Sequence, residues 1–185
     1  MEKIFLTCFE PFGSRSINIS QMVVDRIRIN DNRLLEKKTL KVSYLDIDKE
    51  ISEILNTNCD YLLLTGEAGS RAHISLEKVA INQKSAKISD NYGVLFVNKR
   101  IDEDNNEYYT NIDVEKLNKI LQEKGFDTEV SNNAGTFLCN MSYFLALRHV
   151  KKYNLKTKVL FIHFPTDENR LLEYQRTLEE ILELL

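Results

Sequence analysis

The chain has 185 residues, which is enough for one domain of ordinary size with a substantial core. Hydrophobic residues make up 43% of it, and it has only two prolines and six glycines, a composition that excludes a disordered segment. The formal charge of −3 comes from 25 basic and 28 acidic residues, so no basic field is available to attract nucleic acid.

Strand and helix patterns alternate along the first part of the chain. Residues 3–7 and 61–65 are apolar runs typical of buried strands, and a further strand is expected near residues 39–44. Helical spacing follows at residues 18–28 and 46–56. We therefore expect an α/β fold, a single-domain three-layer α/β/α sandwich over residues 1–185 with a mostly parallel twisted sheet.

The middle of the chain is less regular. An apolar run at residues 74–82 is interrupted by Glu77, and a polar stretch follows to residue 100. Alternation at residues 94–97 suggests a short hairpin or an extended arm; a core strand there is more economical than an exposed interface. Residues 101–110 are acidic and irregular, as expected of a solvated loop.

The last part returns to alternating elements. Asp113 can cap a helix that runs to residue 124, where Gly125 ends it, and strands are expected at residues 127–131 and 158–163. An apolar helical run at residues 136–153 lies between these strands. A final amphipathic helix is expected over residues 167–185. Its apolar face would hold Leu171, Leu172, Tyr174, Leu178, Ile181 and Leu182.

Cys139 is the first candidate for chemistry, because it falls in the first turn of the helical run. Unpaired N–H groups and the positive end of the helix dipole are expected there to lower the pKa of the thiol and to provide an oxyanion site. The plain alternative is that Cys139 is a small buried apolar residue, as most single cysteines are.

Two other residues could complete a catalytic group with Cys139. His163 ends a strand pattern, at the sheet edge where ligands usually bind, and Glu77 offers a carboxylate to orient the imidazole. Alternatively, His163 is a satisfied histidine at that edge, and Glu77 is a surface carboxylate paired with Lys78 or Lys84.

Six segments, spread from residue 3 to about residue 165, resemble in order the signature segments of the pyroglutamyl-peptidase I family. These cysteine peptidases, also called pyrrolidone-carboxylate peptidases, remove an amino-terminal pyroglutamyl residue. The segments are Thr7-Cys-Phe-Glu-Pro-Phe-Gly13, Gly66-Glu-Ala-Gly-Ser-Arg71, Glu77-Lys-Val-Ala-Ile-Asn82, Ser89-Asp-Asn-Tyr-Gly93, Asn133-Ala-Gly-Thr-Phe-Leu-Cys-Asn140 and Phe161-Ile-His-Phe-Pro165.

The resemblance implies a role for each candidate. Cys139 would be the nucleophile, His163 the general base and then acid, and Glu77 the orienting carboxylate, acting through a thioester acyl-enzyme without a cofactor or metal. Further residues would bind the pyroglutamyl ring or lie near it. They are Phe9, Phe12, Asn18, Glu67, Lys87, Phe137 and Leu138.

Several of these positions have simpler explanations or depart from the family pattern. Phe9 and Phe12 could be core residues and Asn18 only a helix cap. Cys8 replaces a glycine usual in the family, Glu67 stands where glutamine is common, and Lys87 stands where an arginine is usual. Lysine lacks the forked geometry of arginine, so its role would differ.

Three other functions are compatible with the sequence. The first is a catalytically weak or inactive relative that binds pyroglutamyl or other blocked peptide ends. The second is a nucleotide-binding domain, suggested by the Gly66-Glu-Ala-Gly69 turn after a strand, although this spacing fits no phosphate-binding motif. The third is a zinc site formed by Cys139, His163 and Glu77, which lacks a closely spaced ligand pair.

The cysteine count bears on the compartment. Three cysteines form no C-x-x-C pair and leave one unpaired in any pairing, which favours a reducing cytoplasm. No secretory signal or membrane-length apolar run is apparent. The resemblance implies peptide substrates and a homo-oligomer, a dimer or a tetramer, with no nucleic-acid or membrane partner.

Overall fold

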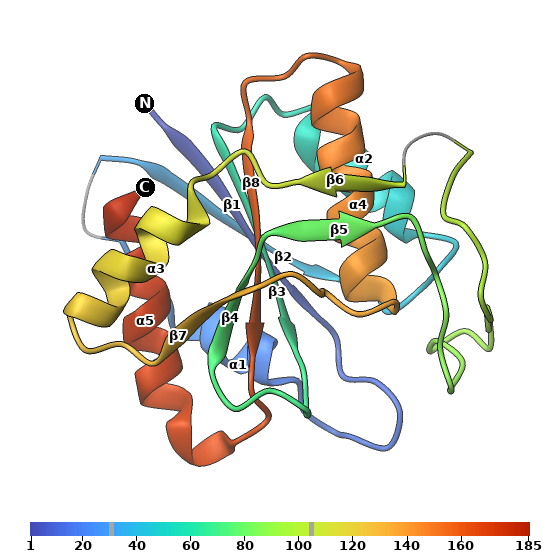
Figure 1. Ribbon diagram of the computed structural model, residues 1–185, viewed down its shortest axis with the longest axis horizontal. Helices are drawn as coiled ribbons and strands as arrows, with labels where there is room; N and C mark the ends of the chain where they lie inside the picture. The colour runs from blue at the N-terminus through green and yellow to red at the C-terminus, as the bar shows by residue number, and fades with distance from the viewer. Residues whose placement is uncertain (30–31, 104–105) are drawn as a thin grey trace.

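The computed structural model of the protein describes residues 1–29, 32–103 and 106–185. A six-stranded sheet, in the order β2-β1-β3-β8-β4-β7, forms the middle layer (Figure 1). Its strands are β1 (Lys3–Phe9), β2 (Leu34–Leu40), β3 (Tyr61–Glu67), β4 (Ile74–Glu77), β7 (Thr128–Ser131) and β8 (Lys158–Phe164). The helices are α1 (Ile19–Arg26), α2 (Ile47–Leu55), α3 (Val114–Glu123), α4 (Leu138–Lys152) and α5 (Leu171–Leu184), with a short 3₁₀ turn at Glu168–Arg170 before α5.

The sheet is mostly parallel, which confirms the predicted fold class. Strands β2, β1, β3 and β8 run in one direction, and β4 and β7 are parallel to each other. Strand β4 pairs with β8 in the antiparallel direction. The carboxyl ends of β3 and β8 therefore lie at one edge of the sheet, where ligands of α/β proteins usually bind.

Alternating side chains of the strands build a separate apolar core on each face of the sheet. Phe5, Leu62 and Phe161 face the layer of α2 and α4, whereas Leu6, Leu63 and Ile162 face the layer of α1, α3 and α5. Both faces of each central strand are buried, so these strands are continuous apolar runs in the sequence. The three-layer prediction is thereby confirmed.

The apolar run at residues 74–82 is not one strand. It divides at Lys78 into β4 and β5 (Val79–Ile81), and β5 pairs with β6 (Glu107–Tyr109) in a separate two-stranded sheet that packs on α4. The prediction of a solvated loop at residues 101–110 is therefore wrong at β6, where Tyr108 is buried against Phe144. Residues 104–105 of that predicted loop lie outside the described residues.

Residues 83–100 form an extended arm rather than a core strand. Val94 and Phe96 pack against the core, while Leu95 and Val97 are 48% and 57% exposed. The core-strand interpretation of residues 94–97 is therefore wrong, and the extended-arm interpretation is confirmed.

The bounds of one strand and the exposure of one leucine also differ from expectation. Strand β2 covers Leu34–Leu40, whereas a strand was expected at residues 39–44. Three consecutive charged residues, 36–38, occupy its middle, and only Leu40 is fully buried, so no apolar run marks this strand in the sequence. Leu172, predicted on the apolar face of the last helix, is exposed at the first turn of α5.

None of the described helices combines the length and apolar character that crossing a bilayer requires.

Candidate active site

Cys139 occupies the second position of helix α4, as its place in the sequence predicted. Phe137 precedes the helix in an extended conformation, and Leu138 and Cys139 begin the first turn, whose N–H groups have no acceptor within the helix. The turn before them is shaped by Gly135, whose φ of +78° is a left-handed conformation that suits glycine. The nucleophile candidate thus lies beside backbone donors.

The thiol is nevertheless not acidified by its position. Burial raises the pKa of Cys139 to about 12, and the negative charges of Glu77 and Glu67 add to the rise, while a backbone hydrogen bond opposes it. The prediction of a lowered pKa is therefore wrong, because desolvation and two carboxylates outweigh the helix dipole. At neutral pH the resting sulfur holds its proton, and a neighbouring base must remove it for attack.

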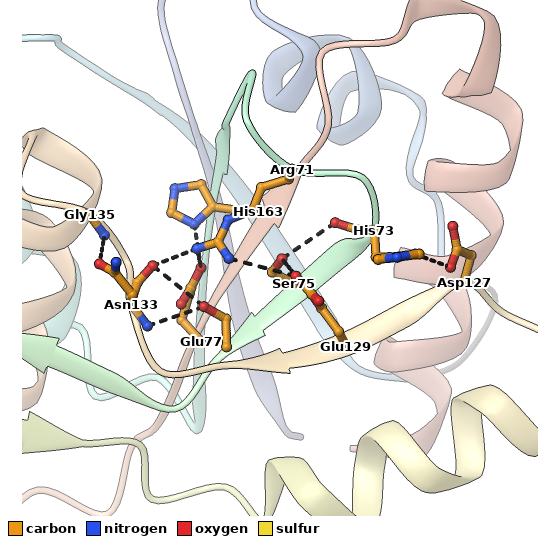
Figure 2. Close-up of polar contacts among 10 residues, drawn as sticks. Arg71, His73, Ser75, Glu77, Asp127, Glu129, Asn133, Gly135 and His163 are labelled. Carbon is orange, nitrogen blue, oxygen red and sulfur yellow. Dashed lines mark hydrogen bonds and ion pairs between the residues drawn. The ribbon is translucent and has the colours of Figure 1, made fainter.

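His163 and Glu77 form a buried pair on adjacent strands. The Nδ1 atom of His163 lies 2.7 Å from Oε1 of Glu77, and the two side chains are 4% and 0% exposed (Figure 2). Glu77 is the register partner of Phe161, two residues before His163, so the carboxylate and the imidazole share the face of the sheet that carries α4. This excludes the interpretation of Glu77 as a surface carboxylate paired with Lys78 or Lys84.

The absence of a side chain at Gly66 lets the sulfur of Cys139 lie next to His163. It is the register partner of His163 on β3, and a Cβ atom built on it would lie 2.8 Å from Sγ of Cys139 and 3.0 Å from Phe161. The sulfur therefore rests against bare backbone next to the histidine. Three groups thus lie side by side over β3, β8 and β4: the thiol, the imidazole and the carboxylate.

Substituting Gly66 with alanine is expected to displace the sulfur. The added Cβ overlaps both the sulfur and an aromatic ring, so we expect kcat on a pyroglutamyl amide, the substrate that the family resemblance implies, to fall roughly 100-fold through misplacement of the candidate nucleophile. The free energy of unfolding should fall by about 1–3 kcal/mol through overpacking. Steady-state kinetics and thermal melts check both effects.

Gly69→Ala is the matched control, because its Cβ would meet only Thr166, at an ordinary 3.6 Å. It should retain kcat and melting temperature. Wild-type kcat in Gly66→Ala would contradict the placement of the sulfur.

A cavity of about 220 Å³ opens beside these groups and is mostly apolar. Cys139 and His163 line it, whereas Glu77 lies behind the histidine. Six of the residues predicted to bind the ring also line it. They are Phe9, Phe12, Asn18, Glu67, Phe137 and Leu138.

Asn18 and Glu67 have further contacts within the protein. The Oδ1 atom of Asn18 accepts from Ser20 N at 3.0 Å, so Asn18 caps α1 as well as lining the cavity. One oxygen of Glu67 accepts from Ile19 N at 2.8 Å, and the other lies 3.1 Å from Nε of Arg15. The helix start and the arginine together stabilise a carboxylate in the wall of the cavity.

Lys87 is exposed on the arm and is not among the residues that line the cavity. The arm that carries Lys87 contacts the wall of the cavity through a chain of aromatic rings. The ring of Phe96 packs edge-on against Tyr44, which packs against Phe137 at 5.7 Å. The arm thus supports the aromatic wall from outside.

Several residues of the site were missed by sequence reasoning. Ala68, Ala134, Gly135 and Thr136 line the cavity and lie in segments that carry the family resemblance, so the motifs themselves were an available signal. Val42 also lines it, but no pattern in the sequence marks it. Arg71 contacts Glu77 directly, and the only signal for it in the sequence is its place at the end of the Gly66–Arg71 motif.

The site offers no support for the metal or nucleotide alternatives. Within residues 1–29, 32–103 and 106–185, no group of three or more His, Cys, Asp or Glu side chains could hold a metal ion. Gly66 lies inside β3 and packs against a sulfur atom, which is not the place of a phosphate-binding loop. The fold and the site therefore define a class: an α/β protein whose cysteine, histidine and glutamate side chains meet over adjacent strands, as in cysteine hydrolases.

Comparison with known proteins narrows that class. The family model described as pyroglutamyl peptidase matches residues 2–177. Pyrrolidone-carboxylate peptidase 1 of Caldanaerobacter subterraneus is 33% identical over 178 residues, covering 95% of this chain and 88% of that protein. The pyrrolidone-carboxylate peptidase of Fusobacterium nucleatum is 36% identical over 173 residues, covering 89% and 78%.

Solved structures agree with this relationship. The pyrrolidone carboxyl peptidase of Thermus thermophilus superposes with a TM-score of 0.90 at 27% identity, covering 98% of this chain and all of that one. The enzyme of Thermococcus litoralis gives 0.91 at 26%, covering 100% and 93%. The chain belongs to the pyroglutamyl peptidase family and is a cysteine peptidase.

Proposed function

We propose that this protein is a cysteine exopeptidase that hydrolyses the peptide bond after an amino-terminal pyroglutamyl residue. The observation that carries the proposal is that the side chains of Cys139, His163 and Glu77 lie side by side over three adjacent strands. The first two also line a small, mostly apolar cavity. Such a cavity suits a flat, uncharged lactam ring better than a charged amino terminus.

The binding role of the cavity follows from the chemistry of its walls. The rings of Phe9, Phe12 and Phe137 would sandwich the lactam. The carboxylate of Glu67 would accept a hydrogen bond from the lactam N–H, as the amide carbonyl of a glutamine would at the same place. Because Arg15 and Ile19 N hold this carboxylate, its orientation is fixed before the substrate arrives.

The chemical steps follow from the state of each group at rest. His163 takes the proton of the Cys139 thiol as the sulfur attacks the scissile carbonyl carbon, and Glu77 stabilises the resulting imidazolium. The first N–H groups of α4 hold the oxyanion. His163 then protonates the leaving amine, which leaves a thioester on the sulfur. Water, activated by the same histidine, hydrolyses the thioester and releases pyroglutamate.

The decisive experiment compares three amides that share one chromogenic leaving group. We expect turnover of the pyroglutamyl amide, and a kcat/KM at least about 100-fold lower for the prolyl and glutaminyl amides. Their charged amine would lose its water in a mostly apolar cavity whose carboxylate, Glu67, is already paired with Arg15. Binding of the pyroglutamyl amide without turnover would instead favour the binding-module alternative. Equal turnover of all three would contradict the assigned specificity.

We also propose that the enzyme acts in the cytoplasm and assembles as a homo-oligomer, in line with the family resemblance. The state of its cysteines supports the first point, since Cys8, Cys59 and Cys139 are all free thiols. Exposed apolar side chains on the arm support the second, because surfaces of this kind favour association. They are Ile88, Tyr92, Leu95 and Val97.

A further inference from the structure

Arg71 connects two parts of the site that are distant in sequence. Its Nη2 atom donates to Oε1 of Glu77 at 2.9 Å and to the backbone oxygen of Asn133 at 2.5 Å (Figure 2). Asn133 lies at the start of the turn that leads into α4 and Cys139. A single guanidinium nitrogen therefore contacts both the orienting carboxylate and the loop that carries the nucleophile.

The carboxylate has few other partners. Oε1 of Glu77 receives donors from Arg71 and His163, and among the described residues Oε2 has no hydrogen-bond partner although it is buried. The orientation of the carboxylate thus depends on two donors that meet at one oxygen. If the arginine were lost, the imidazole alone would hold it.

The contact between Arg71 and Glu77 also matters because it pairs two opposite charges. The side chain of Glu77 is fully buried, and a buried carboxylate without a nearby cation is costly. While the imidazole of His163 is neutral, Arg71 is the cation that contacts this carboxylate. Once the imidazole has taken the thiol proton, an ionised Glu77 is needed beside it. Arg71 therefore supplies the positive charge that offsets this buried carboxylate before the proton moves.

Building on the proposed peptidase function, we propose that Arg71 is a positioning residue for this reaction. It pairs with the Glu77 carboxylate and keeps it aimed at His163, and it fixes the Asn133 turn at the distance that places Cys139 over Gly66. It acts through these groups and does not itself touch the reacting atoms. Its second guanidinium nitrogen lies 3.6 Å from the partly exposed Glu129, which helps to hold the fork in place.

Arg170 provides a matched comparison within the same chain. It is about as exposed as Arg71, at 25% against 20%, and it also pairs with carboxylates, those of Asp127 and Glu173. It likewise donates to a backbone oxygen, that of Ala72. Arg170 does not contact Glu77, His163 or Cys139 in any of these interactions, so its removal tests the general cost of losing such an arginine.

The experiment measures kcat, KM and melting temperature on a pyroglutamyl amide for Arg71→Ala, Arg71→Gln, Arg71→Lys and Arg170→Ala. We expect kcat to fall about 100-fold in the alanine and glutamine variants while KM changes less than about threefold, because misplaced groups slow the chemical step more than ring binding. Lysine restores the charge but not the fork, so Arg71→Lys should recover a large part of kcat. Arg170→Ala should keep kcat within about threefold even if its melting temperature falls.

Three results would overturn the inference. They are a kcat within about threefold of wild type in both neutral variants, a change confined to KM, which would place Arg71 against the substrate, and an equal loss of kcat in Arg170→Ala. If Arg71→Ala does not fold, the glutamine and lysine variants decide between these outcomes. A wild-type protein that does not turn over the amide at all would refute the proposed function instead, so the two failures are distinguishable.

Discussion

Replacing Cys139 with alanine is expected to lower kcat by at least about 10⁴-fold on a pyroglutamyl amide, because no other group can form the thioester. Cys139→Ser should be nearly as inactive, since a hydroxyl is a far weaker nucleophile here. The protein should remain folded in both variants, with circular dichroism and melting temperature close to wild type.

Chemical labelling tests the same residue in the unmodified protein. Cys8 and Cys59 are buried, whereas Cys139 is only partly buried and lines the cavity together with His163, which can take the proton of the thiol. An alkylating agent should therefore react with Cys139 first. Its modification should stop turnover, and substrate should protect it. Cys59→Ala is the matched control and should retain kcat/KM within about threefold. Full activity in Cys139→Ala would end the case for an acyl-enzyme.

The second large effect is expected for Glu77→Gln. The amide keeps the size of the side chain but cannot stabilise the imidazolium and can hold the wrong tautomer of His163, so we expect kcat to fall roughly 10³-fold or more. It also leaves the Arg71 guanidinium without its closest anion, which should lower the free energy of unfolding by about 1–3 kcal/mol. Kinetics and chemical denaturation measure the two effects.

Glu180→Gln serves as the control for this substitution. Glu180 is a partly buried carboxylate on α5 that pairs with Lys124, and α5 packs on the face of the sheet opposite to α4 and Cys139. Its amide variant should keep the wild-type kcat. A Glu77→Gln enzyme with kcat within tenfold of wild type would mean that the imidazole is oriented by something other than this carboxylate.

Much of the site could be predicted because it depends on regular elements. The apolar run ending at His163 predicts a buried strand, and the helical spacing after residue 136 puts Cys139 in a first turn, so the sheet edge brings both together. Glu77 could be found because a carboxylate inside an apolar run is unusual. These inferences need only the periodicity of apolar residues, which can be read directly from the sequence.

The partners of these residues could not be predicted in the same way. The plain alternative for Glu77 was an ion pair with Lys78 or Lys84, yet Lys78 pairs with Glu115, and the buried carboxylate contacts His163, as expected, together with Arg71, which no pattern indicated. That contact depends on the path of the loop between β3 and β4, which no periodic pattern specifies. The pKa of Cys139 was predicted in the wrong direction for a related reason: a helix dipole follows from position in the chain, but burial follows from the whole fold.

The start of the arm is hydrogen-bonded to residues on both sides of Cys139. Asn140, fully buried, bonds to the backbone of Ile81 and Gln83, and Thr136 exchanges hydrogen bonds with the backbone of Ser85. Asn140, just after Cys139, and Thr136, in the turn before it, therefore both hold the start of the arm in place. A movement of the arm away from the domain would break these hydrogen bonds and displace the sulfur of Cys139, so we expect the arm to stay closed whenever the proposed nucleophile is in position.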